Sequence, residues 1–399
     1  MDRRTFLKLM AGASALAVSS CAGHASSSKA PRITQKPAAG LPAQVFAAGV
    51  EKNPSEEAIK RAVCESAEAA TDFSWLSYGD AVFIKPVLNS GYPYPSTTSP
   101  IAIAAMVELL KKKGAGRVIV GDMSGIEHVK LSPDGLKGSS RRLMEKSGMA
   151  EAVLASGAEL HFFEEAGWDA FYEDAPTAGE NWNGPLMMPN ILKEVDHIVL
   201  MPRCGRHVLA GSTLGLKAAV GYWRTDTRLE YHHHASSFHE KTAEANTART
   251  LLKKQRLVLT AADRILTTFG PDKGYVLQPE AGLVIASTSI VAHDMVSLAW
   301  LLENRRNLPE SEKNGFLDTS KLVARYANRY VVTMLGGLGK AVLSEALIKN
   351  DIESIFDDRI LNHAYLVFGG VPEVIIRDAG SPVPEKMKKR LCEMTVFQG

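Results

Sequence analysis

Short apolar runs alternate with amphipathic segments along most of the chain. The runs typical of buried strands lie at residues 81–84, 117–120, 159–163, 197–201, 257–260 and 283–286. Between them, apolar residues recur at helical spacing near 140–156, 241–253 and 289–303. This alternation predicts an α/β fold in which helices flank a mostly parallel sheet, either as one large layer or as two lobes around a cleft.

The clearest single unit runs from residue 81 to residue 122. Its first strand is followed by Ser99 and Pro100, an N-cap and a first-turn proline, and the helix that they begin ends at Gly114. A second strand then follows at 117–120. Two parallel strands joined by a helix cross over right-handedly, so the carboxyl ends of both strands meet at one edge of the sheet.

The pattern becomes mostly helical after about residue 305. Helices are predicted at 319–334 and 340–349, before a last strand at 374–377. We therefore divide the body of the chain into an α/β core, 45–305, and a mostly helical region, 306–399.

The first 21 residues have the features of an export signal. Arg3 and Arg4 precede the short apolar stretch 9–18, which is too short to be an anchor helix. The arginine pair resembles the twin-arginine export signal, and an ordinary secretory signal is the alternative. Residues 18–21 resemble a lipobox that ends at Cys21. We expect recognition by the twin-arginine machinery, lipid attachment at Cys21 and a periplasmic or cell-surface location on a membrane.

Residues 22–44 are rich in Ala, Ser and Pro and contain no acidic residue, which predicts a flexible linker. The chain as a whole has 46 basic and 44 acidic residues and no long basic run, so we expect no nucleic-acid partner. Beyond Cys21 only Cys64, Cys204 and Cys392 remain, without a close pair. This spacing argues against an iron–sulfur cluster and against a disulfide framework.

Residues with chemical potential follow the predicted strands. In open α/β sheets the ligand crevice lies beyond the carboxyl ends of the strands, where Lys85 and Asp122 stand. The segment after the strand 197–201 is the richest, because His207 offers a base and Lys217 an amine. Each also has an ordinary interpretation, His207 as a core histidine and Lys217 as a surface lysine.

Gly211, Thr213 and Gly215 stand between these two residues, and such small residues let the backbone approach a ligand closely. Downstream, residues 232–234 are three consecutive histidines, of which at most two could bind one metal ion. His239 and the residue after it begin like a helical zinc motif that the following sequence does not complete. The chain has no P-loop and no glycine-rich dinucleotide fingerprint after its first predicted strand.

The order of these motifs resembles the domain of unknown function 362 family over about residues 80–300. The resemblance is carried by the segments Phe83–Asn89, Thr97–Pro100, Gly121–Asp122, Pro202–His207, Lys217–Gly221 and Gly282–Asp294. The chain departs from the family at Val87 and Ala218, where asparagine is frequent, and at Gly205, where lysine is usual.

The spacing of His207, Lys217 and His233 is also similar to a segment of the nickel-dependent lactate racemase family. That similarity implies His207 as an acid/base, Lys217 as the covalent anchor of a nickel-bearing nucleotide and His233 as a metal ligand. Nickel or another divalent metal is therefore a candidate cofactor. The Gly-Thr-His segment expected earlier in that family is missing here.

We interpret the chain as an exported α/β lipoprotein that acts as a metal- or cofactor-assisted enzyme, an isomerase or oxidoreductase, on a small anionic substrate. The predicted site comprises His207, Lys217 and Asp122 for catalysis, Lys85, Gly211, Thr213 and Gly215 for cofactor binding, and His233 for metal. The alternative is an envelope lipoprotein that binds a small ligand or metal without turnover. A maturation or scaffolding factor for another envelope enzyme is a third interpretation.

Overall fold

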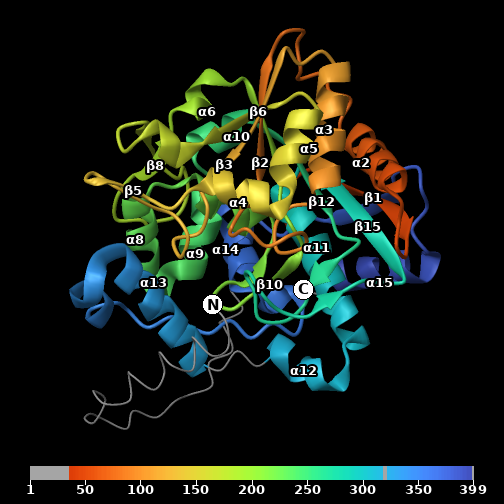
Figure 1. The fold of residues 1–399 in the computed structure, drawn as a ribbon. Coiled ribbons are helices and arrows are strands. Elements are labelled where there is room, and N and C mark those ends of the chain that lie inside the picture. The colour runs from red at the N-terminus through yellow and green to blue at the C-terminus, as the bar shows by residue number, and fades with distance from the viewer. Residues whose placement is uncertain (1–35, 318–320, 398–399) are drawn as a thin grey trace. The chain divides into compact units, whose positions relative to one another are not determined.

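The computed structural model describes residues 36–317 and 321–397. The signal peptide and the lipid-bearing Cys21 that we predict lie outside these ranges. The centre of the described part is an eight-stranded sheet in the order β16-β1-β15-β12-β9-β2-β3-β6 (Figure 1). Its strands are β1 (Ala43–Glu51), β2 (Ala81–Pro86), β3 (Arg117–Asp122), β6 (Glu159–Phe162), β9 (His197–Met201), β12 (Gln255–Ala261), β15 (Ala281–Ser287) and β16 (Val374–Asp378).

The strands of this sheet are mostly parallel, as the sequence predicts. β15 runs antiparallel to both of its neighbours, β1 and β12, and the other neighbouring pairs are parallel. The reason is the connection before β15. Between β12 and β15 the chain forms only the short strands β13 (Ile265–Leu266) and β14 (Val276–Leu277), without the crossover helix that a parallel return needs.

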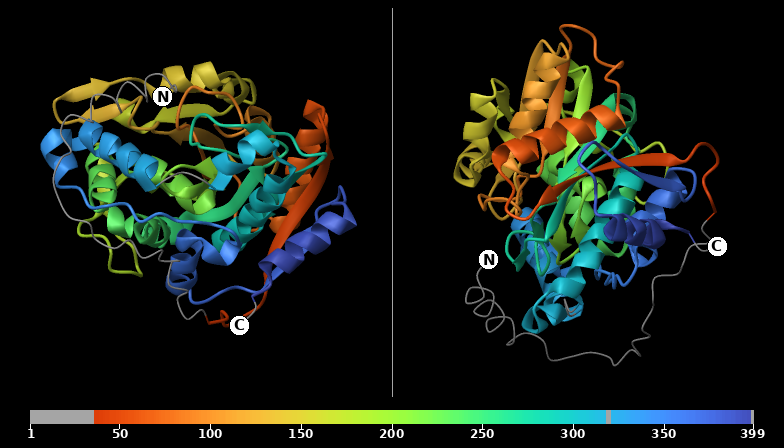
Figure 2. Two further views of the ribbon diagram at one scale, coloured as in Figure 1. Left: turned by 90° about the horizontal axis from the view of Figure 1, so that it is seen from below. Right: turned by 90° about the vertical axis from the view of Figure 1, so that its right-hand side faces the viewer.

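Helices cover both faces of the sheet, because successive strand residues point to opposite sides. On β2, Val82 and Ile84 belong to one buried apolar cluster and Phe83 to the other. The first cluster includes residues of α2 (Glu56–Ala70), α3 (Pro100–Lys112), α4 (Ser140–Ser147) and α5 (Met149–Ala155). The second includes residues of α7 (Gly215–Ala218), α9 (Phe238–Ala245), α11 (Ile290–Asn304), α14 (Arg359–Val367) and α15 (Glu385–Thr395) (Figure 2).

The remaining elements lie outside the central sheet. They are the strands β4 (Lys130–Ser132), β5 (Gly135–Lys137), β7 (Phe171–Asp174), β8 (Leu186–Pro189), β10 (Gly205–His207) and β11 (Gly211–Thr213), and the helices α6 (Ile191–Glu194), α8 (Thr225–His233), α10 (Arg249–Lys254), α12 (Glu310–Leu317) and α13 (Lys321–Val342). No described helix is both long enough and apolar enough to cross a membrane.

The second half of the chain differs from the sequence prediction in one helix. The helix predicted at 340–349 is wrong, because α13 continues to Val342 across a non-helical Gly337 and the chain beyond it is not helical. Glu345 ties that later segment to the turn after α8, since its amide donates to the carbonyl of His233 and its carboxylate accepts from Ser236.

The two ends of the body also join the sheet. The region 306–399 contributes the edge strand β16, which pairs with β1 in parallel. At the other end, residues 36–44 belong to the segment that we predicted as a linker, yet Pro37 forms a bridge with Val371 and β1 begins at Ala43. Backbone pairing, which composition does not reveal, holds this part of the chain against the body.

Candidate functional site

Lys85 and Asp122 form an ion pair where β2 and β3 end, with 2.8 Å between Nζ and Oδ1. Neither residue faces solvent, since Lys85 is 0% and Asp122 3% exposed. The lysine also donates to the carbonyl of Pro86, and the Asp122 carboxylate accepts the amides of Leu88 and Met123. Burial lowers the pKa of Lys85, and the charge of Asp122 opposes that shift. The pair is therefore satisfied within the chain rather than presented to a ligand.

Gly221 packs directly against this ion pair. A Cβ at this position would overlap both Lys85 Nζ and Asp122 Oδ1. The glycine thus lets the turn after α7 lie directly on the buried charges, which connects the strand ends with the segment that carries Lys217.

His207 ends strand β10, which pairs with β11 in a short hairpin. Its Nδ1 accepts hydrogen bonds from the amides of Leu209 and Ala210, at 3.1 and 3.3 Å. Burial, followed by the charge of Lys217, holds the pKa of His207 well below its ordinary value. The ring is therefore neutral, and because Nδ1 is an acceptor, the proton is on Nε2. His207 in this state is a hydrogen-bond donor rather than a base.

Lys217 lies on the short helix α7 and is partly buried. Its ammonium group is 5.7 Å from the ring centroid of Tyr231 and 5.9 Å from that of Phe238. Burial, reinforced by the positive charges of Arg228 and Arg203, lowers the pKa of Lys217 to about 7. In the part of the chain that the structure describes, no carboxylate lies within ion-pair distance of this amine. At neutral pH about half of the Lys217 side chains are uncharged.

A small cavity adjoins Lys217. Its lining is apolar except for four polar side chains: Ser212, Lys217, Asp294 and Asp358. Asp294 accepts the amides of Gly215 and Leu216, at 2.8 Å each, and so fixes the start of α7.

Asp358, which also lines this cavity, caps α14 by accepting the amide of Leu361 at 2.8 Å. The side-chain amide of Asn350 donates to its other oxygen at 3.3 Å. Burial raises the pKa of Asp358 to about 7. The cavity therefore contains an amine and a carboxyl group that both change protonation near neutral pH.

The three small residues predicted to bind a cofactor have partners within the chain. A Cβ at Gly215 would lie 2.8 Å from Asp294 Oδ1, and one at Gly211 would meet Ile352 and Asn350. The hydroxyl of Thr213 accepts a hydrogen bond from Arg203 at 3.2 Å. The close approach that these positions allow is thus used by the protein's own side chains.

Lys217 is not among the charges that act on His233 in the described part of the chain. Those charges are His234, Lys340, Glu345 and Lys241, of which Lys340 lies on α13. The neighbouring His232 takes the inner position. The charge of Lys217 acts on His232, Asn328 contacts its Nδ1 at 2.9 Å, and burial lowers its pKa to about 3. Consecutive helix residues point about 100° apart, so only one of them faces inward.

Two buried arginines add positive charge around Lys217. Arg203 donates to the carbonyls of Pro95 and Pro271, and Arg228 to those of Met123 and Ser124. Neither forms an ion pair with a carboxylate among the residues described, and the Nε atom of each is buried without a hydrogen-bond partner. Burial lowers the pKa of both to about 10, so they keep their charge at neutral pH.

Comparison with protein families identifies the chain. The model of the family described as "Domain of unknown function (DUF362)" matches residues 82–299, which is more than half of the 399 residues. The protein belongs to the DUF362 family. This is the family that the order of motifs predicts, and the match ends within α11, before the segment that supplies Asp358.

Searches with this DUF362 protein find no match among curated proteins. Two solved structures are similar at low identity. A protein from Thermotoga maritima is 13% identical with a TM-score of 0.34, over 54% of this chain and 52% of the other. The lactate racemase apoprotein from Thermoanaerobacterium thermosaccharolyticum is 11% identical with a TM-score of 0.37, over 84% of each chain. This chain thus spans about half the length of the first, and neither likeness carries an argument about chemistry.

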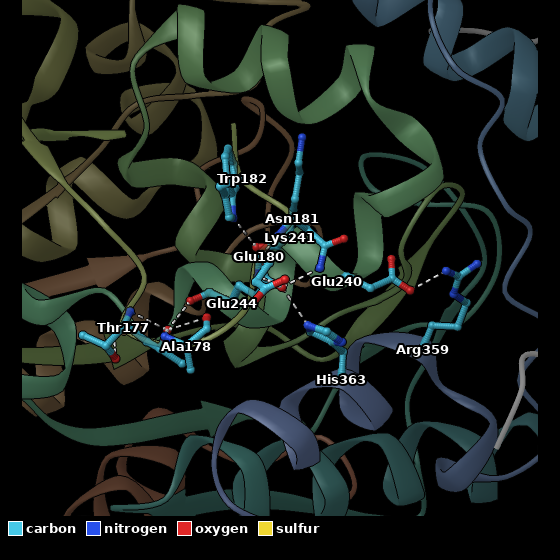
Figure 3. A network of polar contacts seen from close by, with 11 residues as sticks. Thr177, Ala178, Glu180, Asn181, Trp182, Glu240, Lys241, Glu244, Arg359 and His363 are labelled. Atoms are coloured by element: carbon cyan, nitrogen blue, oxygen red, sulfur yellow. Dashed lines mark hydrogen bonds and ion pairs between the residues drawn. The ribbon is translucent and has the colours of Figure 1, made fainter. Parts of the chain in front are cut away.

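A polar network joins α14, which lies outside the family match and begins after Asp358, to α9, which lies inside it (Figure 3). His363 of α14 contacts the buried Glu244 of α9 at 2.8 Å, and Arg359 forms an ion pair with Glu240. The Glu244 carboxylate also accepts from the amide groups of Asn181.

Asp358 lines the cavity, but sequence reasoning missed it as a candidate for chemistry. The signal available in the sequence was its position immediately before a helix, where it acts as the N-cap.

Proposed function

We propose that this DUF362 protein is an enzyme that binds a small anionic substrate beside Lys217 and transfers a proton at a carbon bearing a hydroxyl group. One observation carries the proposal: the Lys217 amine has a pKa of about 7 and no carboxylate partner among the described residues. A lysine that is neutral near pH 7 can act as a base or a nucleophile, whereas an ordinary lysine is almost wholly protonated.

The charges around the amine support the substrate class. Arg203 and Arg228 are buried, keep their charge and each have an Nε without a hydrogen-bond partner. A buried excess of positive charge favours a bound carboxylate or phosphate over a neutral molecule.

The two titrating groups of the cavity support the reaction class. Neutral Lys217 can take a proton from a substrate carbon, and protonated Asp358, which lines the same cavity, can return one. The charge of Lys217 acts on His207, and we propose that the Nε2–H of this histidine stabilises negative charge on a substrate oxygen. Such a set supports isomerisation, and we propose this in preference to redox chemistry.

The nickel-bearing nucleotide that the racemase resemblance implies does not fit these residues. His233, its expected metal ligand, lies with His234 and Glu345 instead of Lys217. Gly211 and Gly215, expected to let the backbone approach a cofactor closely, face residues of the chain itself. We therefore derive no step through that group.

We also propose that the protein is exported and held on a membrane by lipid at Cys21. The support is the arginine pair, the short apolar stretch and the cysteine that follows it. Changing Arg3 and Arg4 to lysine should leave precursor in the cytoplasm. Unimpaired export of that double variant, or a mature protein that begins elsewhere than at Cys21, would contradict this proposal.

Hydrogen–deuterium exchange tests the enzymatic proposal directly. The full-length protein is incubated in D₂O with small 2-hydroxycarboxylates, and deuterium at the hydroxyl-bearing carbon is followed by NMR. We expect exchange that Lys217→Met abolishes and that His234→Gln, a change at an exposed pair with Glu345, leaves unchanged. Binding of the same acids without exchange would contradict the enzyme and favour the non-catalytic binding protein.

A further inference from the structure

A second group of metal-binding side chains lies away from the Lys217 cavity. Glu127 and His128 belong to the turn between β3 and β4, and Asp272 to the loop between β13 and β14. One ligand atom of each of the three residues lies within 4.8 Å of the other two. We propose that Glu127, His128 and Asp272 bind a divalent transition-metal ion.

The spacing of the two inner ligands suits a shared ion better than a hydrogen bond. His128 Nε2 and Asp272 Oδ2 are 3.5 Å apart, which is long for a hydrogen bond. Two atoms that each lie about 2.1 Å from one metal ion are about 3.0–3.4 Å apart in octahedral or tetrahedral geometry. The observed separation is therefore close to that of two ligands of one ion.

The state of His128 Nε2 agrees with this spacing. The atom is buried, although the side chain as a whole is 30% exposed, and its contact with Asp272 is too long to be a good hydrogen bond. A buried imidazole nitrogen without a good hydrogen bond is costly, and a metal ion would satisfy it. The Asp272 side chain next to it is 8% exposed.

Asn89 contacts both loops that carry the proposed ligands and fixes them relative to each other. Its carbonyl accepts the amide of Gly125, whereas its side-chain amide donates to Asp272 Oδ1. A side chain at position 125 would collide with Asn89, so the glycine allows this contact. Ser96 adds a hydrogen bond to the carbonyl of Asp272 at 2.7 Å. Because Asp272 Oδ1 accepts from Asn89, Asp272 Oδ2 faces His128. Metal-binding carboxylates are commonly oriented by such a hydrogen bond to the other oxygen.

The donor set identifies the class of ion. One imidazole and two carboxylates suit Mn²⁺, Fe²⁺ or Zn²⁺, while an all-oxygen set would suit Ca²⁺ or Mg²⁺. Glu127, the third ligand, is exposed. Three protein ligands leave coordination positions for water or a ligand. This site does not rest on the function proposed for Lys217.

Mn²⁺ binding to the chelator-treated full-length protein tests the site. Electron paramagnetic resonance of free Mn²⁺ should show saturable binding of one ion per chain. Glu127→Gln, which changes an exposed side chain, and His128→Gln should each weaken binding at least tenfold while the circular dichroism spectrum stays unchanged. His234→Gln, at another exposed histidine–carboxylate pair, should bind Mn²⁺ as the wild type does.

Competition distinguishes the class of ion. Zn²⁺ should displace Mn²⁺, and Ca²⁺ at the same concentration should not. The proposal is overturned if the wild type binds no Mn²⁺ saturably or if His128→Gln binds it as tightly as the wild type. Displacement by Ca²⁺ as effective as that by Zn²⁺ would contradict the transition-metal assignment.

Discussion

Lys217→Met should stabilise the protein, and the gain should depend on pH. The pKa of Lys217 falls from 10.5 to about 7 on folding. Each unit corresponds to about 1.4 kcal/mol, so burying the charged form costs up to about 5 kcal/mol when both states are protonated. Because the side chain retains some solvent contact, we expect a gain of roughly 2–5 kcal/mol at pH 6. Methionine has a similar volume and needs no charge.

The direction of this pH dependence follows from the number of protons that the folded and unfolded states bind. Between pH 7 and 10.5 the unfolded lysine binds a proton that the folded lysine has lost, so wild-type stability from this group rises with pH. The stability difference between variant and wild type should therefore shrink by up to about 2.7 kcal/mol from pH 7 to pH 9. Urea unfolding of the variant and the wild type at pH 6, 7, 8 and 9 measures this stability difference.

Lys241→Met is the matched control. Lys241 is also buried, with 0% side-chain exposure, but its Nζ lies 3.2 Å from Glu230. Removing it breaks an ion pair, so this variant should be less stable than the wild type throughout the pH range. A difference between Lys217→Met and wild type that stays constant from pH 6 to pH 9 would refute the depressed pKa of Lys217.

Two further predictions concern the charges beneath the site. Asp122→Asn removes the ion-pair partner of the fully buried Lys85, which must then either bury an unpaired charge or lose its proton. This variant should reduce the free energy of unfolding by about 3–5 kcal/mol, and adding Lys85→Met to it should recover part of the loss in urea unfolding. Gly221→Ala should reduce the free energy of unfolding by about 1–3 kcal/mol in thermal unfolding, because its Cβ would overlap the Lys85–Asp122 ion pair. Gly339→Ala, at a position where a Cβ would meet no atom within 4 Å, should leave the free energy of unfolding nearly unchanged. Equal effects of the two substitutions would contradict the close contact at Gly221.

The fold was largely predictable because its strands and helices are encoded locally. Strand β2 and helix α3 follow from an apolar run, a capping serine and a proline, which act over a few residues. The antiparallel direction of β15 depends on what connects it to β12, and the missing helix between them was the available signal. The helix that we predicted at 340–349 was wrong because α13 continues past its break at Gly337 and ends at Val342.

The candidate site was only partly predictable, because its protonation depends on distant packing. His207 and Lys217 stand ten positions apart, so their proximity could be inferred from one segment. Asp358 reaches the same cavity from another part of the chain, and no local pattern connects the two. His232 rather than His233 turns inward because of the rotation of α8 against its neighbours, which three identical residues in a row do not encode.

The titration of Lys217 itself tests the central claim most directly. Trace acetic anhydride is reacted with the full-length protein between pH 5 and pH 11, and acetylation of each lysine is quantified by mass spectrometry. We predict a midpoint near pH 7 for Lys217, unchanged in His233→Gln, and midpoints near pH 10 for exposed lysines. A midpoint near pH 10 for Lys217 would contradict the account, because its amine would then be protonated at neutral pH and unable to accept a proton from a substrate.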